Sequence, residues 1–176
     1  IISNIVKYAD SIVNNKITTL YIPPNILEEV YDLLKTKPNV KINKLLVGVE
    51  PIKRHTLNKY FNLNPNIKIV NGYGPTETTI CSTALEYTKS IKLDKIVSIG
   101  KPIGNTKIYI LDKYMHIVPI GVSGEICITG DGVGKGYIAN EEETNKNFVK
   151  NTFNDLSPKI YKTGDLAKWN YDGTIS

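Results

Sequence analysis

The sequence has 176 residues, of which 41% are hydrophobic and 22% are charged, and its formal net charge is +5. This length suits one compact domain or two small subdomains, and the composition is that of an ordinary soluble protein. The lysines lie singly or in pairs without interleaved aromatic residues, and no apolar run could span a membrane, so neither a nucleic acid nor a membrane is expected as a partner.

The first half of the chain predicts alternating helices and strands. Apolar residues at helical spacing predict a helix over about the first fifteen residues, and a β-rich stretch at 17–22 predicts a strand. Pro23-Pro24 ends that strand and opens a second amphipathic helix. The apolar run at 44–49 predicts a buried strand, Pro51 opens a third helix, and 67–70 predicts the next strand. This alternation favours a parallel sheet.

The second half has a different character, because its candidate strands are short and are separated by glycine and proline. These candidate strands cover residues 106–111, 124–129 and 159–162. Asn140 can cap a short helix between them, since Glu143 follows three residues later as in a capping box. This half therefore predicts a small β-barrel or rolled sheet.

The predicted fold class is α/β, with the end of a parallel α/β subdomain over 1–95 and a β-barrel-like subdomain over 96–176. The sequence does not begin with Met and opens inside an amphipathic pattern. We therefore expect it to be an internal fragment of a longer protein.

The most informative stretch is NGYGPTETT at 71–79, which directly follows a predicted strand. Ligands of open parallel sheets bind at the carboxyl ends of the strands, and glycines let the backbone come close to a ligand. Tyr73 offers a flat apolar face with a polar tip, and Thr76 offers a hydroxyl. Glu77 supplies a carboxylate oxygen, the ligand type that Mg²⁺ prefers. The alternative is a plain Gly-Pro turn with a capping threonine.

NGYGPTETT resembles the signature loop of the ANL superfamily of adenylate-forming enzymes, in the form found in adenylation domains of nonribosomal peptide synthetases. Two later stretches resemble family motifs in the same order: the PIG, GEICI and GKGY segments within 119–137, and YKTGDL at 161–166. LLVG at 45–48 resembles the strand before the loop, although Val49 stands where a second glycine is usual. The resemblance covers nearly the whole chain, and the ordered motifs make it specific.

The resemblance implies a role for each matching residue of an ATP site. The residues implied to contact ATP or AMP are Asn71, Gly72, Tyr73, Gly74, Thr76 and Asp165. Tyr73 would stack on adenine, Thr76 would contact the phosphates, and Glu77 would bind the Mg²⁺ that bridges them. Asp165 would accept hydrogen bonds from both ribose hydroxyls, which suits an ionised carboxylate. For Asp165 the alternative is a turn residue that bonds its own backbone.

The resemblance also implies part of an amino-acid pocket. Its residues are Tyr21, Leu46, Gly48, Gly72, Ile80 and Cys81. None of them carries a charge, so the expected substrate side chain is uncharged and apolar, because burying an unpaired charge is costly. Because the hydroxyl of Tyr21 could bond one polar atom, a substrate with a small polar side chain remains an alternative. For Leu46 and Ile80 the alternative is simple packing of the sheet.

The function implied by the resemblance is activation of an amino acid with ATP to aminoacyl-AMP, with Thr76 and Glu77 as the catalytic residues, followed by transfer to the phosphopantetheine thiol of a carrier domain. The implied partners are the amino-acid substrate and the peptidyl-carrier, condensation and other modules of the same cytoplasmic synthetase. The family's phosphate-binding loop, its Asp for the substrate amine and its C-terminal Lys have no match in this sequence. The chain alone is therefore expected to be inactive.

Two alternatives remain open at this point. One is a non-catalytic β-rich interaction module, and the other is a different member of the superfamily, such as an acyl-CoA synthetase or a D-alanine–carrier-protein ligase. The glycine-rich run at 130–136 lacks the spacing of a P-loop and is predicted to be a turn between strands. Cys81 and Cys127 form no CxxC pair, so neither a zinc site nor a disulfide framework is indicated, and a reducing cytoplasm fits best.

Overall fold

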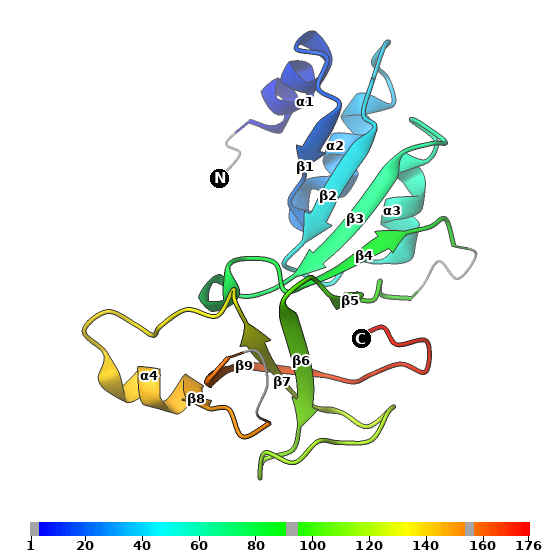
Figure 1. Cartoon of the computed structure of the whole chain (residues 1–176). Helices are drawn as coiled ribbons and strands as arrows, with labels where there is room; N and C mark the ends of the chain where they lie inside the picture. Colours follow the sequence, from blue (N-terminus) through cyan, green and yellow to red (C-terminus); the bar gives the residue numbers. More distant parts are fainter. Residues whose placement is uncertain (1–3, 91–94, 154–156) are drawn as a thin grey trace. The chain divides into compact units, whose positions relative to one another are not determined.

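The structure is a computed structural model that describes residues 4–90, 95–153 and 157–176 (Figure 1). The chain forms two compact units, the first from Ile1–Asn71 with Leu85–Val97 and the second from Gly72–Ala84 with Ser98–Ser176. The chain thus leaves the first unit after Asn71, returns to it at Leu85 and leaves it again after Val97. The subdomains expected over 1–95 and 96–176 stay a prediction, and the second unit takes in the segment after β3.

The first unit is built on a sheet that carries helices. Its strands follow the order β1 (Thr19–Tyr21), β2 (Lys44–Gly48), β3 (Lys68–Tyr73) and β4 (Thr83–Tyr87). The last two residues of β3 and the first two residues of β4 belong to the second unit. Its helices are α1 (Ile5–Asn14), the short 3₁₀ helix η1 (Pro24–Ile26), α2 (Leu27–Leu34) and α3 (Arg54–Tyr60). β1 and β2 pair in parallel, and Figure 1 shows β3 running the same way and β4 the opposite way. The parallel α/β character expected of this half is confirmed.

Helices α1 and α2 form where the sequence predicts, and α1, α2 and α3 each bury one face. The side chain of Asn4 caps α1 by accepting a hydrogen bond of 2.9 Å from the backbone N–H of Lys7. Helix α2 packs against both α1 and α3. Tyr60 of α3 is fully buried, and its hydroxyl donates to the carbonyl of Leu27 over 2.7 Å, which satisfies the buried phenol. Burial raises the pKa of Tyr60.

The segment between β2 and α3 departs from the expectation. Helix α3 begins at Arg54 and not at Pro51, because the carbonyl of Ile52 accepts from the backbone N–H of Val97 at 2.8 Å, which keeps this stretch extended. Val49 takes the left-handed φ of +79°, a conformation that is rare for a β-branched residue, and its side chain is 73% exposed. The second glycine that is usual at this position would relieve that conformation.

The second unit is rich in β-structure. Its main sheet has the strand order β6 (Thr106–Leu111), β7 (Gly124–Gly130), β9 (Lys159–Ala167) and β8 (Phe148–Lys150), and every neighbouring pair is antiparallel. It also holds η2 (Thr76–Thr78), β5 (Lys101–Pro102) and α4 (Glu141–Asn147). The first two residues of β4 pair with β5. The expected β-rich half is confirmed, and among the described residues the four strands form an open sheet.

Helix α4 begins as the capping pattern predicts. The Asn140 side chain accepts a hydrogen bond of 3.1 Å from the backbone N–H of Glu143. Strand β9 is longer than expected, since it runs to Ala167 and includes the TGD motif, and β8 was not predicted.

Alternating residues of β7 pack into two different apolar clusters, one on each face of the sheet. Ile126 and Ile128 pack on one face with strand β6, whereas Cys127 is buried on the other face with Leu111 and Ile160. Burial raises the pKa of the Cys127 thiol to about 12, and Cys81 and Cys127 are both free thiols in this structure. Among the described residues, no helix has the length and apolar character needed to cross a membrane.

Replacing Gly130 by alanine is expected to destabilise the second unit. Gly130 has a φ of +134°, and an added Cβ would lie 2.1 Å from the backbone oxygen of Asn105. The strained backbone conformation alone should lower the free energy of unfolding by about 1–3 kcal/mol, and the rearrangement that relieves the clash should lower it further. The measurement is the urea midpoint of unfolding. Gly104→Ala is the matched control, because no atom lies within 4 Å of its Cβ position, and equal midpoints for the two variants would contradict the prediction.

Candidate nucleotide site

The motif at 71–79 begins inside a strand and ends in a tight loop. Strand β3 continues to Tyr73, whose carbonyl accepts a hydrogen bond of 2.7 Å from the N–H of Ser82. A Cβ on Gly74 would lie 2.6 Å from the same nitrogen, so the loop closes this tightly only with glycine there. The hydroxyl of Thr78 is buried and lies 2.7 Å from that of Ser82. These contacts fix the base of the loop, while Thr76 at its tip is exposed.

Tyr73 and Asp165 are in direct contact, although 92 positions separate them in the chain. The Tyr73 hydroxyl donates to Oδ2 of Asp165 over 2.6 Å. Burial, followed by this hydrogen bond, raises the pKa of Tyr73, so the phenol stays protonated and remains a donor. The Asp165 carboxylate is exposed and retains acceptor capacity for a ligand.

The backbone around Asp165 is held by β7. Gly164 takes a left-handed φ of +78°, and its N–H donates to Oε1 of Glu125 over 3.0 Å. The Thr163 hydroxyl donates to the carbonyl of Ile126 and accepts from the N–H of Asp165. Thr163, rather than Asp165, thus makes the side-chain bond within the turn. The register between β7 and β9 shifts at this point, which re-aims the following residues.

The carboxylate of Glu77 is held by a phenol that the sequence reasoning did not connect with it. The Tyr137 hydroxyl donates to Oε1 of Glu77 over 2.7 Å, and the Tyr161 hydroxyl lies 3.4 Å from that of Tyr137. The hydrogen bond from Tyr137 lowers the pKa of Glu77, against the opposing effect of desolvation. The pKa of Tyr161 is raised, first by burial and then by its contacts with Tyr137 and Glu77.

The glycine-rich segment at 130–136 lies against this loop. The N–H of Gly134 donates to the carbonyl of Glu77 over 2.8 Å, and the Thr79 hydroxyl donates to the carbonyl of Gly132 over 2.8 Å. A Cβ on Gly132 would approach the carbonyl oxygen of Thr78 to 3.0 Å. The segment was predicted to be a turn between strands. It does connect β7 to α4, but its glycines also allow the backbone to pack closely on the motif loop.

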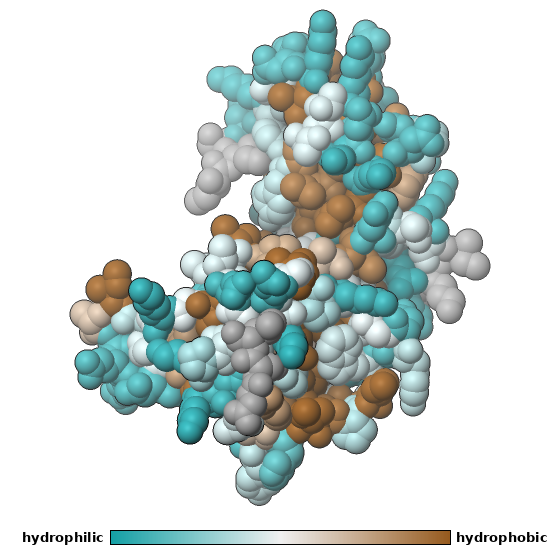
Figure 2. All heavy atoms as spheres, in the orientation of Figure 1, coloured by the Kyte–Doolittle hydropathy of each residue, from teal (hydrophilic) through white to brown (hydrophobic). Residues whose placement is uncertain are grey.

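The residues expected to line an amino-acid pocket are divided between the two units. Tyr21 and Leu46 lie in the first unit, 43% and 41% exposed, and the Tyr21 hydroxyl is 3.5 Å from the carbonyl of Gly48. Gly72, Ile80 and Cys81 belong to the second unit, where Ile80 is 72% exposed and Cys81 is partly buried. Figure 2 shows apolar atoms gathered over the face of the first unit's sheet that is turned to the viewer. The assignment of these six residues to an amino-acid pocket stays a prediction.

A sequence model of the AMP-binding enzyme family matches residues 4–138. The chain belongs to this family of AMP-binding enzymes. The resemblance to adenylate-forming enzymes that the motifs indicated is thereby confirmed.

Several relatives of this chain are large synthetases. Tyrocidine synthase 3 of Brevibacillus parabrevis is 36% identical over 160 residues, which are 91% of the chain and 2% of that protein. Gramicidin S synthase 2 of Brevibacillus brevis is 41% identical over 134 residues, 76% of the chain and 3% of that protein. Bacitracin synthase 3 of Bacillus licheniformis is 35% identical over 161 residues, 92% of the chain and 2% of that protein. The chain therefore spans a small part of the length of these relatives.

Solved structures agree on the fold. PA1221, described as an NRPS protein containing adenylation and PCP domains, matches with a TM-score of 0.86 at 23% identity, over 97% of this chain and 35% of that one. The nonribosomal peptide synthetase FmoA3 matches with a TM-score of 0.90 at 23% identity, over 99% of this chain and 19% of that one. At these identities the likeness establishes the shared fold.

The donor groups near the motif loop of this member of the AMP-binding enzyme family would fit a Mg²⁺ held together with nucleotide phosphates. Glu77 provides a carboxylate and Thr76 an exposed hydroxyl. Within the described part of the chain, no group of three or more His, Cys, Asp or Glu residues could hold a metal ion by itself. Mg²⁺ is commonly held by one or two carboxylates plus substrate phosphates, and a single protein carboxylate suits that arrangement.

Sequence reasoning missed two further residues, Tyr137 and Glu125, that contact the candidate site. Tyr137 was part of a recognised family segment, and Glu125 was part of another, but neither had an assigned role. Both touch a predicted site residue or the turn that carries one. The signal that could have pointed to Tyr137 is the glycine run before it, since closely spaced glycines indicate that two backbone segments approach each other.

Proposed function

We propose that the chain is part of an adenylation domain that activates an amino acid with ATP, giving aminoacyl-AMP and pyrophosphate, for loading onto a carrier domain. The observation that carries this proposal is the hydrogen bond of 2.6 Å between Tyr73 and Asp165. It brings together an aromatic face that can stack on a base and a carboxylate that can hold a vicinal diol, as a nucleoside requires.

In this proposal the nucleoside lies along the end of β3. The Tyr73 ring stacks on adenine, with Asn71, Gly72 and Gly74 at the edges of the base. Asp165 accepts hydrogen bonds from both ribose hydroxyls, and the Tyr73 hydroxyl holds Asp165 in place. The ring of Tyr73 thus contacts the base, and its hydroxyl orients the carboxylate that binds the ribose.

The phosphates lie toward the tip of the motif loop. Thr76 would contact the phosphates through its hydroxyl, and Glu77 would hold Mg²⁺ through its carboxylate. When bound, Mg²⁺ neutralises charge on the phosphates and orients them. A carboxylate oxygen of the amino acid then attacks the α-phosphorus, and the bond to the pyrophosphate oxygen breaks. Little covalent work falls to Thr76 or Glu77, so their contribution is positioning and electrostatic stabilisation.

The proposed acceptor of the aminoacyl group is the phosphopantetheine thiol of a peptidyl-carrier domain. Support comes from PA1221, whose description includes a PCP domain beside an adenylation domain, and from the synthetases among the relatives. Condensation and other modules of the same synthetase are the further partners of this proposal.

The proposed function is tested by exchange of labelled pyrophosphate into ATP, using the complete domain that contains this sequence. Exchange that requires both an amino acid and Mg²⁺ supports the proposal. Exchange that responds to fatty or aryl acids and to no amino acid would assign the chain to another branch of adenylate-forming enzymes.

The same assay decides the substrate class, and we expect an uncharged, apolar side chain such as that of valine, leucine, isoleucine or phenylalanine. None of the proposed pocket residues carries a charge, and Leu46 and Ile80 offer apolar contact. Burying a charged side chain against them would leave the charge unpaired at a high cost. The measurement is a screen of all the proteinogenic amino acids plus ornithine, and a clear preference for a charged one would overturn the expectation.

A further inference from the structure

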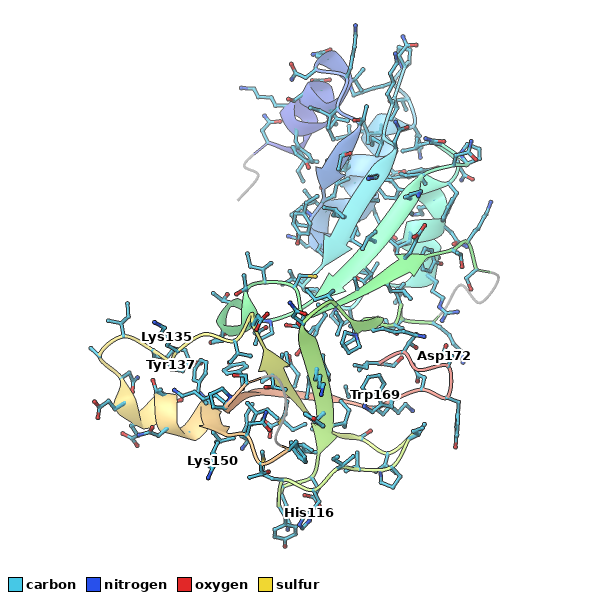
Figure 3. The ribbon with its side chains drawn as sticks, in the orientation of Figure 1. His116, Lys135, Tyr137, Lys150, Trp169 and Asp172 are labelled. Atoms are coloured by element: carbon cyan, nitrogen blue, oxygen red, sulfur yellow. The ribbon has the colours of Figure 1, made fainter. Side chains whose placement is uncertain are left out.

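Tyr137 lies in the segment that leads into α4 and is labelled in Figure 3. Its ring is half-buried and meets the ring of Phe148 edge to face, with centroids 5.5 Å apart. Phe148 in turn packs on Tyr161 at 4.9 Å, and both of these residues are about 5% exposed. The direction of the Tyr137 ring is therefore set by two buried aromatic side chains from β8 and β9.

The backbone on both sides of Tyr137 is also held. The N–H of Tyr137 donates to the hydroxyl of Thr144 over 2.8 Å, and the Lys159 ammonium group donates to the carbonyl of Lys135 over 2.9 Å. Gly136 has a φ of +142°, and a Cβ there would lie 2.4 Å from Cγ2 of Thr144. The segment thus fits this path only with glycine before the tyrosine, and the phenol oxygen has a defined position.

We propose that Tyr137 is a positioning residue for the metal-ligating carboxylate of Glu77, which it holds through the 2.7 Å hydrogen bond from its hydroxyl to Oε1. This inference rests on the proposed function, because it concerns how Glu77 meets Mg²⁺. A second bond, from the N–H of Gly134 to the carbonyl of Glu77, ties the backbone of the same residue to the same segment. Both ends of Glu77 are therefore fixed before a metal arrives.

The hydrogen bond orients one oxygen of the carboxylate and so presents the other to a metal. Carboxylates that ligate metals are commonly held by such outer contacts, and losing one typically lowers metal affinity about 10- to 100-fold. Tyr137 touches neither nucleotide nor metal in this arrangement. Its effect should therefore be confined to metal affinity and should leave the amino-acid KM unchanged.

The test is Mn²⁺ binding to the complete domain in the presence of a non-hydrolysable ATP analogue. Electron paramagnetic resonance measures the binding. Tyr137→Phe keeps the ring against Phe148 and removes only the hydroxyl. We expect the Kd for Mn²⁺ to rise about 10-fold or more, with a thermal midpoint close to that of the wild type. Tyr114→Phe is the matched control, because Tyr114 is 68% exposed and away from the proposed site, and it should change nothing.

A double-mutant cycle separates positioning from a general structural effect. In a Glu77→Gln background, Tyr137→Phe should add little, because the group that it positions has already been altered. Unchanged Mn²⁺ affinity in Tyr137→Phe, or the same fold-change with and without Glu77→Gln, would overturn the inference. If the wild-type domain shows no metal-dependent binding of the analogue, the proposed function fails and this inference fails with it.

Discussion

Replacing Glu77 by glutamine in the complete domain is expected to lower amino-acid-dependent pyrophosphate exchange on the order of 100-fold or more, by analogy with the loss of other electrostatic contacts in active sites. The neutral amide cannot offset the charge of Mg²⁺. Its oxygen can still accept the hydrogen bond from Tyr137, so the shape of the loop is preserved. Glu77 is only partly buried and lies outside the apolar clusters, so the stability of the fold should change little.

The measurement is the rate of exchange over a range of Mg²⁺ concentrations, together with a thermal unfolding curve. Glu86→Gln is the matched control. The substitution removes the same charge, and Glu86 is exposed on β4 in the other unit. A Glu77→Gln domain that exchanges at the wild-type rate with the wild-type Mg²⁺ dependence would show that Glu77 does not serve the metal.

Replacing Asp165 by alanine is expected to raise the KM for ATP by about 100-fold or more. Two hydrogen bonds to the ribose are at stake, each worth roughly 1.5–3 kcal/mol because the acceptor is charged. The Tyr73 hydroxyl loses its partner as well, although water can replace it because the position of Asp165 is exposed. The KM for the amino acid should change far less than the KM for ATP.

The analogue 2′,3′-dideoxy-ATP distinguishes a ribose contact from a general disturbance. The wild-type domain should lose affinity for this analogue by about the same factor as the mutation costs with ATP. The alanine variant should treat ATP and the analogue nearly alike. If the two proteins respond equally to removal of the hydroxyls, Asp165 does not hold the ribose.

Much of the fold could be predicted because its longer elements carry strong local patterns. β6 and β7 are rich in apolar and β-branched residues, and the cap of α4 is built from residues three apart. The short strand β8, by contrast, has three residues and owes its conformation to pairing with β9. The equally short β1 was predicted because it lies within a β-rich stretch of six residues at 17–22, whereas Phe148 and Val149 are flanked by polar residues and show no recognisable period.

The candidate site divides in the same way between local and long-range information. The motif resemblance pointed to Tyr73, Glu77 and Asp165 from their own neighbourhoods in the sequence. The hydrogen bond of Tyr137 to Glu77 spans 60 positions, and that of Gly164 to Glu125 spans 39. Such contacts depend on the register of β7 with β9 and on the path of the glycine-rich segment. The spacing of the glycines indicates a close approach of two backbone segments, but it does not identify the partner.

The interleaved path of the chain limits how related sequences can be recombined. A single crossover placed within Leu85–Val97 would join a motif loop from one parent to a glycine-rich segment and a TGD strand from the other. The motif loop of one parent would then pack against a glycine-rich segment that evolved with a different loop. The packing there is tight, because a Cβ on Gly132 would lie 3.0 Å from the carbonyl oxygen of Thr78. A functional chimera is better made by exchanging Gly72–Ala84 and Ser98–Ser176 together, because these two stretches belong to one compact unit.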